Sequence, residues 1–254
     1  MKNGRRGGYV AAVIAVVLLA GLAVVGSVFA KPQKVIVGNI EVEYDGGFSP
    51  KAMPKNKLTP ISFFLWSKIR TLDGKHPPAI KEFLLQGDKN VTVDVKGVPA
   101  CTSGKLQSQT TSGARKACGD DTIVGSGTTE VEVQFPEQPP IDVKSELLAF
   151  NGGVKGGVTT LYIHAYLTAP VTAAIVTTVK IKKVHKGRYG TESVALVPKI
   201  AGGSGSVTYF KLKFEKGILF GKCPDGKLQA HGTAVFADST KASATVIRPC
   251  TPKG

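Results

Sequence analysis

The stretch TTEVEVQF at residues 128–135 decides the fold class of this chain. Its apolar residues Val131 and Val133 alternate with the acidic residues Glu130 and Glu132. Successive side chains of a β-strand point to opposite faces of the sheet. The alternation therefore predicts a strand with one face in a core and the other in water.

Similar stretches recur along the chain, and short turn signals containing Gly or Pro separate them. The 30 glycines and 15 prolines are scattered singly or in pairs between apolar runs. No amphipathic pattern of the roughly 10–15 residues of a crossover helix lies between the runs, which argues against a parallel sheet. We therefore predict an all-β fold, one large antiparallel β-sandwich or jelly roll of about twelve strands after an N-terminal apolar helix. The expected strands cover residues 34–44, 61–70, 80–85, 91–95, 122–135, 141–150, 159–167, 174–184, 191–198, 207–215, 228–237 and 242–247.

The segment 80–95 fits two interpretations. Ile80 and Phe83 have helical spacing, but DKN at residues 88–90 looks like a hairpin turn that leads into VTVDV at residues 91–95. We predict a strand, a tight turn and a return strand here.

The first thirty residues have the pattern of a secretory signal. Lys2, Arg5 and Arg6 form a positively charged start, residues 9–28 are almost wholly apolar, and the sequence VFA precedes a possible cut after Ala30.

An apolar run of about 20 residues is also long enough to cross a bilayer without being cut. The positive N-terminal flank places the remainder of the chain outside in either case. We expect residues 1–30 to be a signal peptide or an N-terminal membrane anchor, and residues 31–254 to be a single β-rich extracytoplasmic domain.

Four cysteines lie beyond this segment, and an even number in an oxidising compartment favours two disulfides. We predict the pairs Cys101–Cys118 and Cys223–Cys250, because each pair brackets a short local segment. Residues 102–117 between the first pair are polar, so we expect a stapled, partly helical insertion.

The charge balance of the chain is strongly basic. A net charge of +15 falls to +12 once the three cations of the first thirty residues are removed. Such an excess favours anionic partners, such as a cell-envelope polymer or a membrane surface, although it also serves solubility alone.

The densest group of cations lies in VKIKKVHKGRY at residues 179–189. A basic strand can bind phosphate or carboxylate groups, but lysines also protect an edge strand from aggregation. Nucleic-acid binding would require aromatic side chains between the cations, and only Tyr189 is nearby. The candidate anion-binding residues are Lys180, Lys182, Lys183, Lys186 and Arg188.

No nucleophile-elbow, phosphate-loop, dinucleotide-binding or zinc-protease motif occurs in the sequence. The histidines, His76, His164, His185 and His231, are far apart in the chain. We interpret each of them as a hydrogen-bonded or half-exposed strand residue.

Acidic residues also form pairs on the expected strands. Glu41 and Glu43 are two residues apart, as are Glu130 and Glu132, so each pair shares one face of its strand. That face is opposite the apolar one, and we expect both pairs to be solvated. Taken with the missing motifs, the sequence indicates no catalytic residue, no cofactor and no metal.

Several segments resemble a family of uncharacterised secreted proteins of soil actinobacteria. They are HPPAIKEF at residues 76–83, ARKACGDD at 114–121, LLAFNGGVKGG at 147–157, VTTVKIKKVHKGRYGT at 176–191, VPKIAGGSGSV at 197–207 and CPDGKLQAHGTAVFADST at 223–240. The resemblance implies export and an all-β body, and it carries no known activity, ligand or catalytic residue.

We expect a non-enzymatic, secreted or envelope-associated β-domain with a structural or binding role toward an anionic or carbohydrate polymer. The alternative is a secreted hydrolase whose acid and base residues come from distant strands, because a fold class does not reveal a site. A histidine next to a carboxylate in a pocket would favour the hydrolase.

Overall fold

The computed structural model describes residues 32–215 and 217–254. Strands dominate this part of the chain and most of them pair antiparallel, so the predicted all-β class is confirmed. The expected N-terminal apolar helix falls in residues 1–30, outside the described residues.

Twelve strands form one large antiparallel sheet. They are β1 (Gln33–Val37), β2 (Ile40–Ser49), β5 (Ser62–Thr71), β6 (Ile80–Asp88), β8 (Ile123–Val133), β9 (Ile141–Lys155), β10 (Val158–Leu167), β11 (Ala173–Lys186), β12 (Tyr189–Leu196), β13 (Gly205–Phe214), β15 (Lys227–Phe236) and β16 (Lys241–Pro249). Their spatial order is β1-β2-β5-β13-β8-β9-β10-β11-β12-β6-β15-β16.

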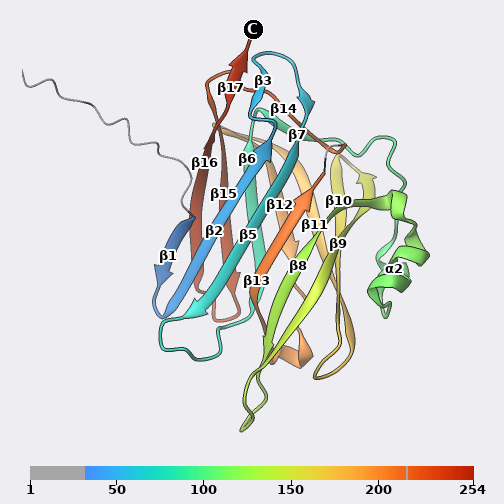
Figure 1. Ribbon diagram of the computed structural model, residues 1–254, viewed down its shortest axis with the longest axis vertical. Helices are drawn as coiled ribbons and strands as arrows, with labels where there is room; N and C mark the ends of the chain where they lie inside the picture. The colour runs from blue at the N-terminus through green and yellow to red at the C-terminus, as the bar shows by residue number, and fades with distance from the viewer. Residues whose placement is uncertain (1–31, 216) are drawn as a thin grey trace, which may run out of the picture.

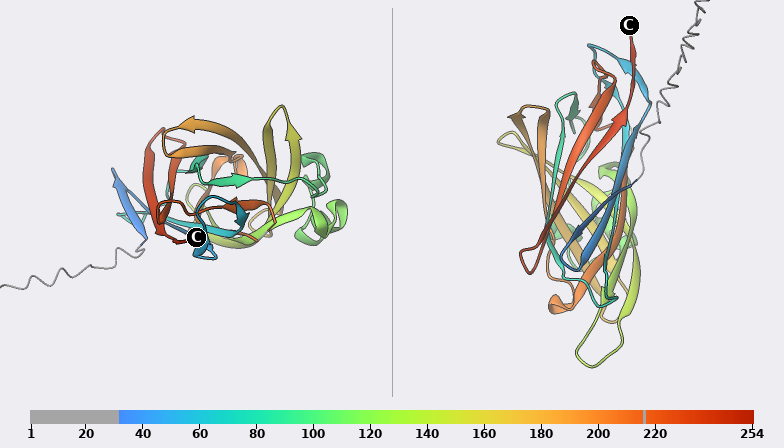
Figure 2. Two further views of the ribbon diagram at one scale, coloured as in Figure 1. Left: turned by 90° about the horizontal axis from the view of Figure 1, so that it is seen from above. Right: turned by 90° about the vertical axis from the view of Figure 1, so that its left-hand side faces the viewer.

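The sheet curves until its two end strands, β1 and β16, lie side by side, so that it is nearly closed (Figure 1, Figure 2). Where the sequence predicts layers packed face to face, the structure has one continuous sheet. Gly127 lets β8 approach β13 closely, because a Cβ at this position would overlap the carbonyl oxygen of Lys211. Bulges on both sides of β8 increase the local twist.

Two small sheets cover one end of the large sheet, the upper end in Figure 1. One contains β4 (Thr59–Pro60), β14 (Leu219–Gly221) and β7 (Val91–Val93) in that order, and the other pairs β3 (Ala52–Pro54) with β17 (Thr251–Lys253) in parallel.

The segment 80–95 contains the predicted strand, but the predicted hairpin is wrong. β6 forms as expected, whereas β7 pairs with β14 and not with β6. The Asp88 carboxylate accepts a hydrogen bond from the backbone N–H of Asn90 at 2.9 Å, and the chain leaves the wall at this point. The turn therefore directs β7 across the end of the large sheet.

The polar insertion is helical, as predicted, and lies on the outside of β9 and β10 (Figure 1). It contains α1 (Ser103–Leu106) and α2 (Thr111–Cys118), and the 3-10 helix η1 (Asp120–Thr122) follows. A second 3-10 helix, η2 (Ala201–Gly203), precedes β13. None of the helices in residues 32–215 and 217–254 combines the length and apolarity needed to cross a bilayer.

Both predicted disulfides are confirmed. The Cα atoms are 5.4 Å apart in Cys101–Cys118 and 6.1 Å apart in Cys223–Cys250. Two disulfides in one chain are consistent with an oxidising, extracytoplasmic compartment.

Candidate ligand-binding cavity

The nearly closed sheet surrounds an apolar cavity of about 310 Å³. Alternation along each strand sends every second side chain inward, and most of these residues are aliphatic or aromatic. Ile163, Ile175 and Val179 point into the cavity. They are only partly buried, because they face open space and not packed atoms. The volume is at the lower end of the roughly 300–1,000 Å³ of small-molecule sites.

Small residues on one wall help to keep the cavity open. Ala230 and Gly232 of β15 and Ala244 of β16 line it, and Phe83 of β6 contributes its ring beside them. A Cβ on Gly232 would lie 3.4 Å from a ring carbon of Phe83. The β15–β16 wall therefore leaves space that larger side chains would fill.

Apolar side chains close both ends of the cavity. At the upper end Ile218 and Leu219 of the β14 segment pack with Ile61 against the inner face of the large sheet. At the lower end Ile200, which is 4% exposed, packs against Val131.

Among the described strands, no strand pairing joins β16 to β1 or β2, the strands that it meets across the wall, and we call this junction the seam. β1 covers its lower part, pairing with β2 from Ile40 to Tyr44, and the β3–β17 pair spans its upper end. Between these elements side chains bridge it. Tyr44 Oη donates to the carbonyl oxygen of Ala242 at 2.8 Å, and Arg248 Nη2 donates to Asp45.

Charged groups gather at the seam beside the apolar cavity. Arg248 and Asp45 both line the cavity, with side chains that are 10% and 18% exposed. Lys51 Nζ lies 4.0 Å from the centre of the Phe48 ring, which also lines the cavity. Burial and then the nearby Arg248 lower the pKa of Lys51, while Asp45 opposes this shift. The seam thus carries two cations and one anion.

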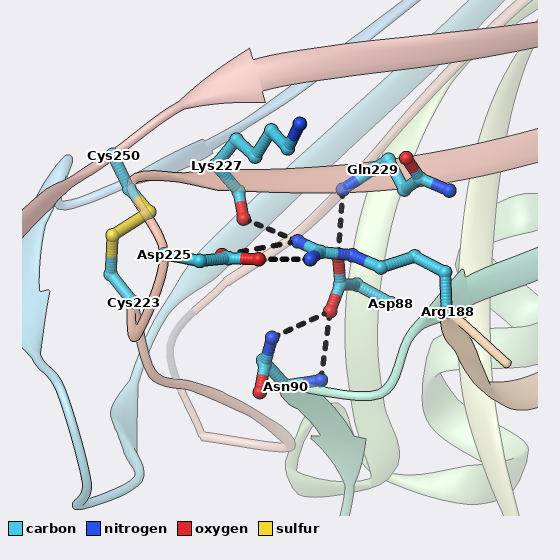
Figure 3. Close-up of polar contacts among 8 residues, drawn as sticks. All are labelled: Asp88, Asn90, Arg188, Cys223, Asp225, Lys227, Gln229 and Cys250. Atoms are coloured by element: carbon cyan, nitrogen blue, oxygen red, sulfur yellow. Dashed lines mark hydrogen bonds and ion pairs between the residues drawn. A yellow bond between two sulfur atoms is a disulfide. The ribbon is translucent and has the colours of Figure 1, made fainter.

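A second ionic cluster closes the upper end and includes Arg188 from the predicted basic set (Figure 3). Arg188 Nε donates to Asp88 at 2.7 Å, and its Nη atoms donate to Asp225 and to the carbonyl oxygen of Lys227. Asp88 also accepts from the backbone N–H of Gln229 at 3.0 Å. Arg188 therefore ties the β6 end and the β12 start to β15 and the disulfide-linked loop.

Lys180, Lys182 and Lys186 lie on the outer face of β11, whereas Lys183, paired with the cavity-lining Thr191, continues the inward register toward the end of the strand. Lys182 and Lys186 contact the Glu192 carboxylate at 2.9 and 2.7 Å, and these bonds, Lys186 first, lower its pKa to about 2. Lys180 and Lys183 are exposed, and no ion pair with either occurs among the described residues. The edge-strand explanation is wrong, because β11 pairs with β10 and β12 on its two sides.

A hydrogen-bonded Ser–His–Glu group lies away from the apolar cavity, and its His76 and Ser206 line a surface pocket of about 620 Å³ beside the β1–β2 turn. His76 Nδ1 is 2.6 Å from Glu132 Oε1, and His76 Nε2 is 3.1 Å from Ser206 Oγ. Ser206 is 1% exposed and donates its hydroxyl to the carbonyl oxygen of Pro77 at 2.6 Å. The hydroxyl has one hydrogen, so its bond to Pro77 competes with the donation to His76 Nε2 that would activate a serine nucleophile.

The remaining histidine interpretations vary in outcome. His164 bonds the carbonyl oxygen of Gln109 at 3.0 Å beneath the helices, and His231 bonds Thr245 at 2.9 Å, as expected of hydrogen-bonded strand residues. His185, on β11, is exposed and therefore differs from the expected hydrogen-bonded or half-exposed strand residue. The contact of His76 with Glu132 was not expected from its position.

The acidic pairs are less solvated than the alternation predicts. Glu41 is 5% exposed, because Arg70 of β5 and Lys34 of β1 contact it at 2.6 and 3.3 Å. Glu130 contacts Lys144 at 3.0 Å. In the described ranges no group of three or more His, Cys, Asp or Glu side chains is arranged to hold a metal ion.

Sequence reasoning missed the cavity and the seam, although one signal was present. Ala242, Ala244 and Val246 occupy inward positions of β16, and Arg248 continues the same alternation. A cation in the apolar register of a strand marks an inward-facing charge.

The fold and site together define an antiparallel β-domain that encloses an apolar cavity. None of the known protein-family profiles matches this chain, and no curated protein matches it significantly. The resemblance to secreted actinobacterial proteins therefore stays a prediction.

Proposed function

We propose that this chain is an extracytoplasmic, non-enzymatic binding protein that carries an apolar small molecule inside its large sheet. One observation supports this most directly: an apolar cavity of about 310 Å³ whose lining comes from strands all around the wall. Burial of an apolar ligand there would gain roughly 25 cal/mol for each Å² of apolar surface removed from water.

The proposed compartment rests on two further features. The first thirty residues have the pattern of an export signal or anchor, and the two disulfides suit an oxidising environment. An exported carrier would hold its ligand in the covered cavity and keep it out of the surrounding water.

A filling substitution tests the proposal. The uncharged fluorophore N-phenyl-1-naphthylamine should bind the purified domain saturably, and Ala244→Phe should weaken that binding at least about tenfold by occupying the space. Ser243→Phe is the matched control, because Ser243 is exposed on the outside of the same strand. Circular dichroism should show both variants folded.

The carrier proposal fails if the wild-type domain binds no fluorophore saturably. It fails equally if the two phenylalanine variants bind as well as the wild type does. Ala230→Leu provides a second filling variant, should Ala244→Phe not fold.

A serine hydrolase is the second candidate, favoured by the chain Ser206–His76–Glu132 beside a surface pocket. The burial of Ser206 and its bond to Pro77 count against it. Labelling with a fluorophosphonate probe decides the matter. We expect no labelling, whereas labelling that disappears in Ser206→Ala would establish the hydrolase.

Binding of an anionic envelope polymer or a membrane surface stays a proposal of its own. Its support is the basic charge balance and the exposed pair Lys180 and Lys183. Retention of the domain on isolated cell wall or anionic vesicles at low salt, lost in Lys180→Glu with Lys183→Glu, would support it.

A further inference from the structure

The charges at the seam specify which ligand the cavity takes, an inference that rests on the carrier function proposed above. Arg248 occupies an inward position of β16, where every other inward residue of the strand is apolar. A guanidinium carries five N–H groups. Its bonds to Asp45 and to the carbonyl oxygen of Ile247 use fewer than these, so donors remain for a ligand.

The local charge is not balanced. Asp45 compensates one positive charge, while Arg248 and Lys51 supply two. Arg248 lowers the pKa of Lys51, since nearby like charges repel. One further negative charge placed between them would neutralise the cluster.

The seam is also the part of the wall where, among the described strands, no backbone ladder holds the neighbouring strands together. Elsewhere a ladder of backbone hydrogen bonds joins each strand to its neighbours in the large sheet, from β2 through β16. At the seam the middle of β2 meets β16 through the side-chain contacts of Tyr44 and Arg248. At this place in the wall side-chain contacts take the role that a backbone ladder has between the other strands.

The other candidate for a head-group site is Arg188, at the upper end of the cavity, and its charge is already neutralised. Arg188 at the upper end bonds Asp88, Asp225 and the carbonyl oxygen of Lys227, and two carboxylates balance its single charge. Asp88 and Gln229 face the cavity from that cluster and offer no unbalanced cation.

We propose that the cavity binds a single-chain amphiphile with one anionic head, a long-chain carboxylate, whose tail lies among the inward side chains and whose head contacts Arg248 and Lys51 at the seam. The single excess charge matches a monoanion. The volume of about 310 Å³ is small for a ligand site, which suits one alkyl chain better than two. Lys51 lies over Phe48, so the head and the first carbons of the tail have adjacent partners.

Displacement of N-phenyl-1-naphthylamine by hexadecanoate and by hexadecanol tests the head group, because the two ligands have alkyl chains of the same length and differ in an anionic against a neutral head. On the wild-type domain we expect hexadecanoate to displace the fluorophore at a concentration about 10–100-fold lower, as expected for a charge-assisted hydrogen bond. In Arg248→Met the preference should fall to within about twofold.

Lys51→Met is the second variant, because it removes the charge that lies over the Phe48 ring. It should reduce the preference several-fold. Lys180→Met, which removes an exposed lysine from the outer face of β11, is the matched control and should leave it unchanged.

The outcomes separate the two proposals. A wild-type domain that binds the fluorophore but prefers neither competitor would overturn the head-group assignment and leave the carrier function standing. The same conclusion follows if Arg248→Met and Lys51→Met both keep the full preference. Failure of the fluorophore to bind the wild-type domain would instead overturn the carrier function itself.

Discussion

Removal of the Asp88 carboxylate should destabilise the domain far more than removal of its neighbour Asp225. The Asp88 side chain is 1% exposed, whereas that of Asp225 is 43% exposed, although both contact Arg188. Alanine variants of the two aspartates therefore compare a buried and a solvated carboxylate that contact the same guanidinium.

The magnitude follows from the contacts that Asp88→Ala leaves unpaired. The carboxylate accepts from the backbone N–H and the side-chain amide of Asn90 at 2.9 and 3.0 Å, from Gln229 at 3.0 Å and from Arg188 at 2.7 Å. Each buried donor without a partner costs about 1–3 kcal/mol. Arg188 keeps Asp225, so we expect a total loss of about 3–5 kcal/mol, as for a broken buried ion pair.

Urea unfolding at neutral pH, followed by circular dichroism, measures this difference. Asp225→Ala should cost no more than about 1 kcal/mol, because an exposed ion pair contributes little. Asp88→Asn keeps the shape of the side chain and should fall between the two. A loss below about 1 kcal/mol in Asp88→Ala, or equal losses in both alanine variants, would refute the reasoning.

Three further predictions concern charge, cross-linking and packing. The pKa of Glu192, lowered to about 2 mainly by Lys186, means that this carboxylate contributes stability above its ordinary pKa of 4.5 and loses it as the pH falls toward 2. Melting temperatures against pH should show Glu192→Gln below the wild type at neutral pH and equal to it near pH 2. Replacing Cys223 and Cys250 together by serine opens a link across a sequence separation of 27 residues and should lower the unfolding free energy by roughly 3 kcal/mol in urea. Phe150→Ala, at a fully buried position beneath the helices, should cost about 3–5 kcal/mol, and Val154→Ala, 60% exposed on the same strand, should stay within about 0.5 kcal/mol.

Much of the strand content was predictable because alternation is a local property. Val131 and Val133 of β8 are 2% and 1% exposed, on the face that the alternation assigns to the core. The stapled insertion and both disulfides were likewise predictable, since each depends on residues close together in the chain.

Predictions that required a partner strand were less successful. The turn at Asp88 looks the same whether the next strand returns beside β6 or crosses the end of the sheet, and the structure has the crossing. Glu41 occupies an outward position, yet Lys34 of β1 and Arg70 of β5 contact its carboxylate and it is buried. Burial on the outer face depends on which segment packs there, and alternation carries no information about that.

The sequence by itself indicated that the chain forms antiparallel strands, that its cysteines pair locally and where its cations lie along the chain, because these properties depend on neighbours within a few tens of residues. Only the tertiary structure decided that twelve strands enclose a cavity and that Asp45 and Arg248, 203 residues apart, meet at its seam. Curvature and closure sum small twists over the whole sheet, so no single stretch of residues encodes them.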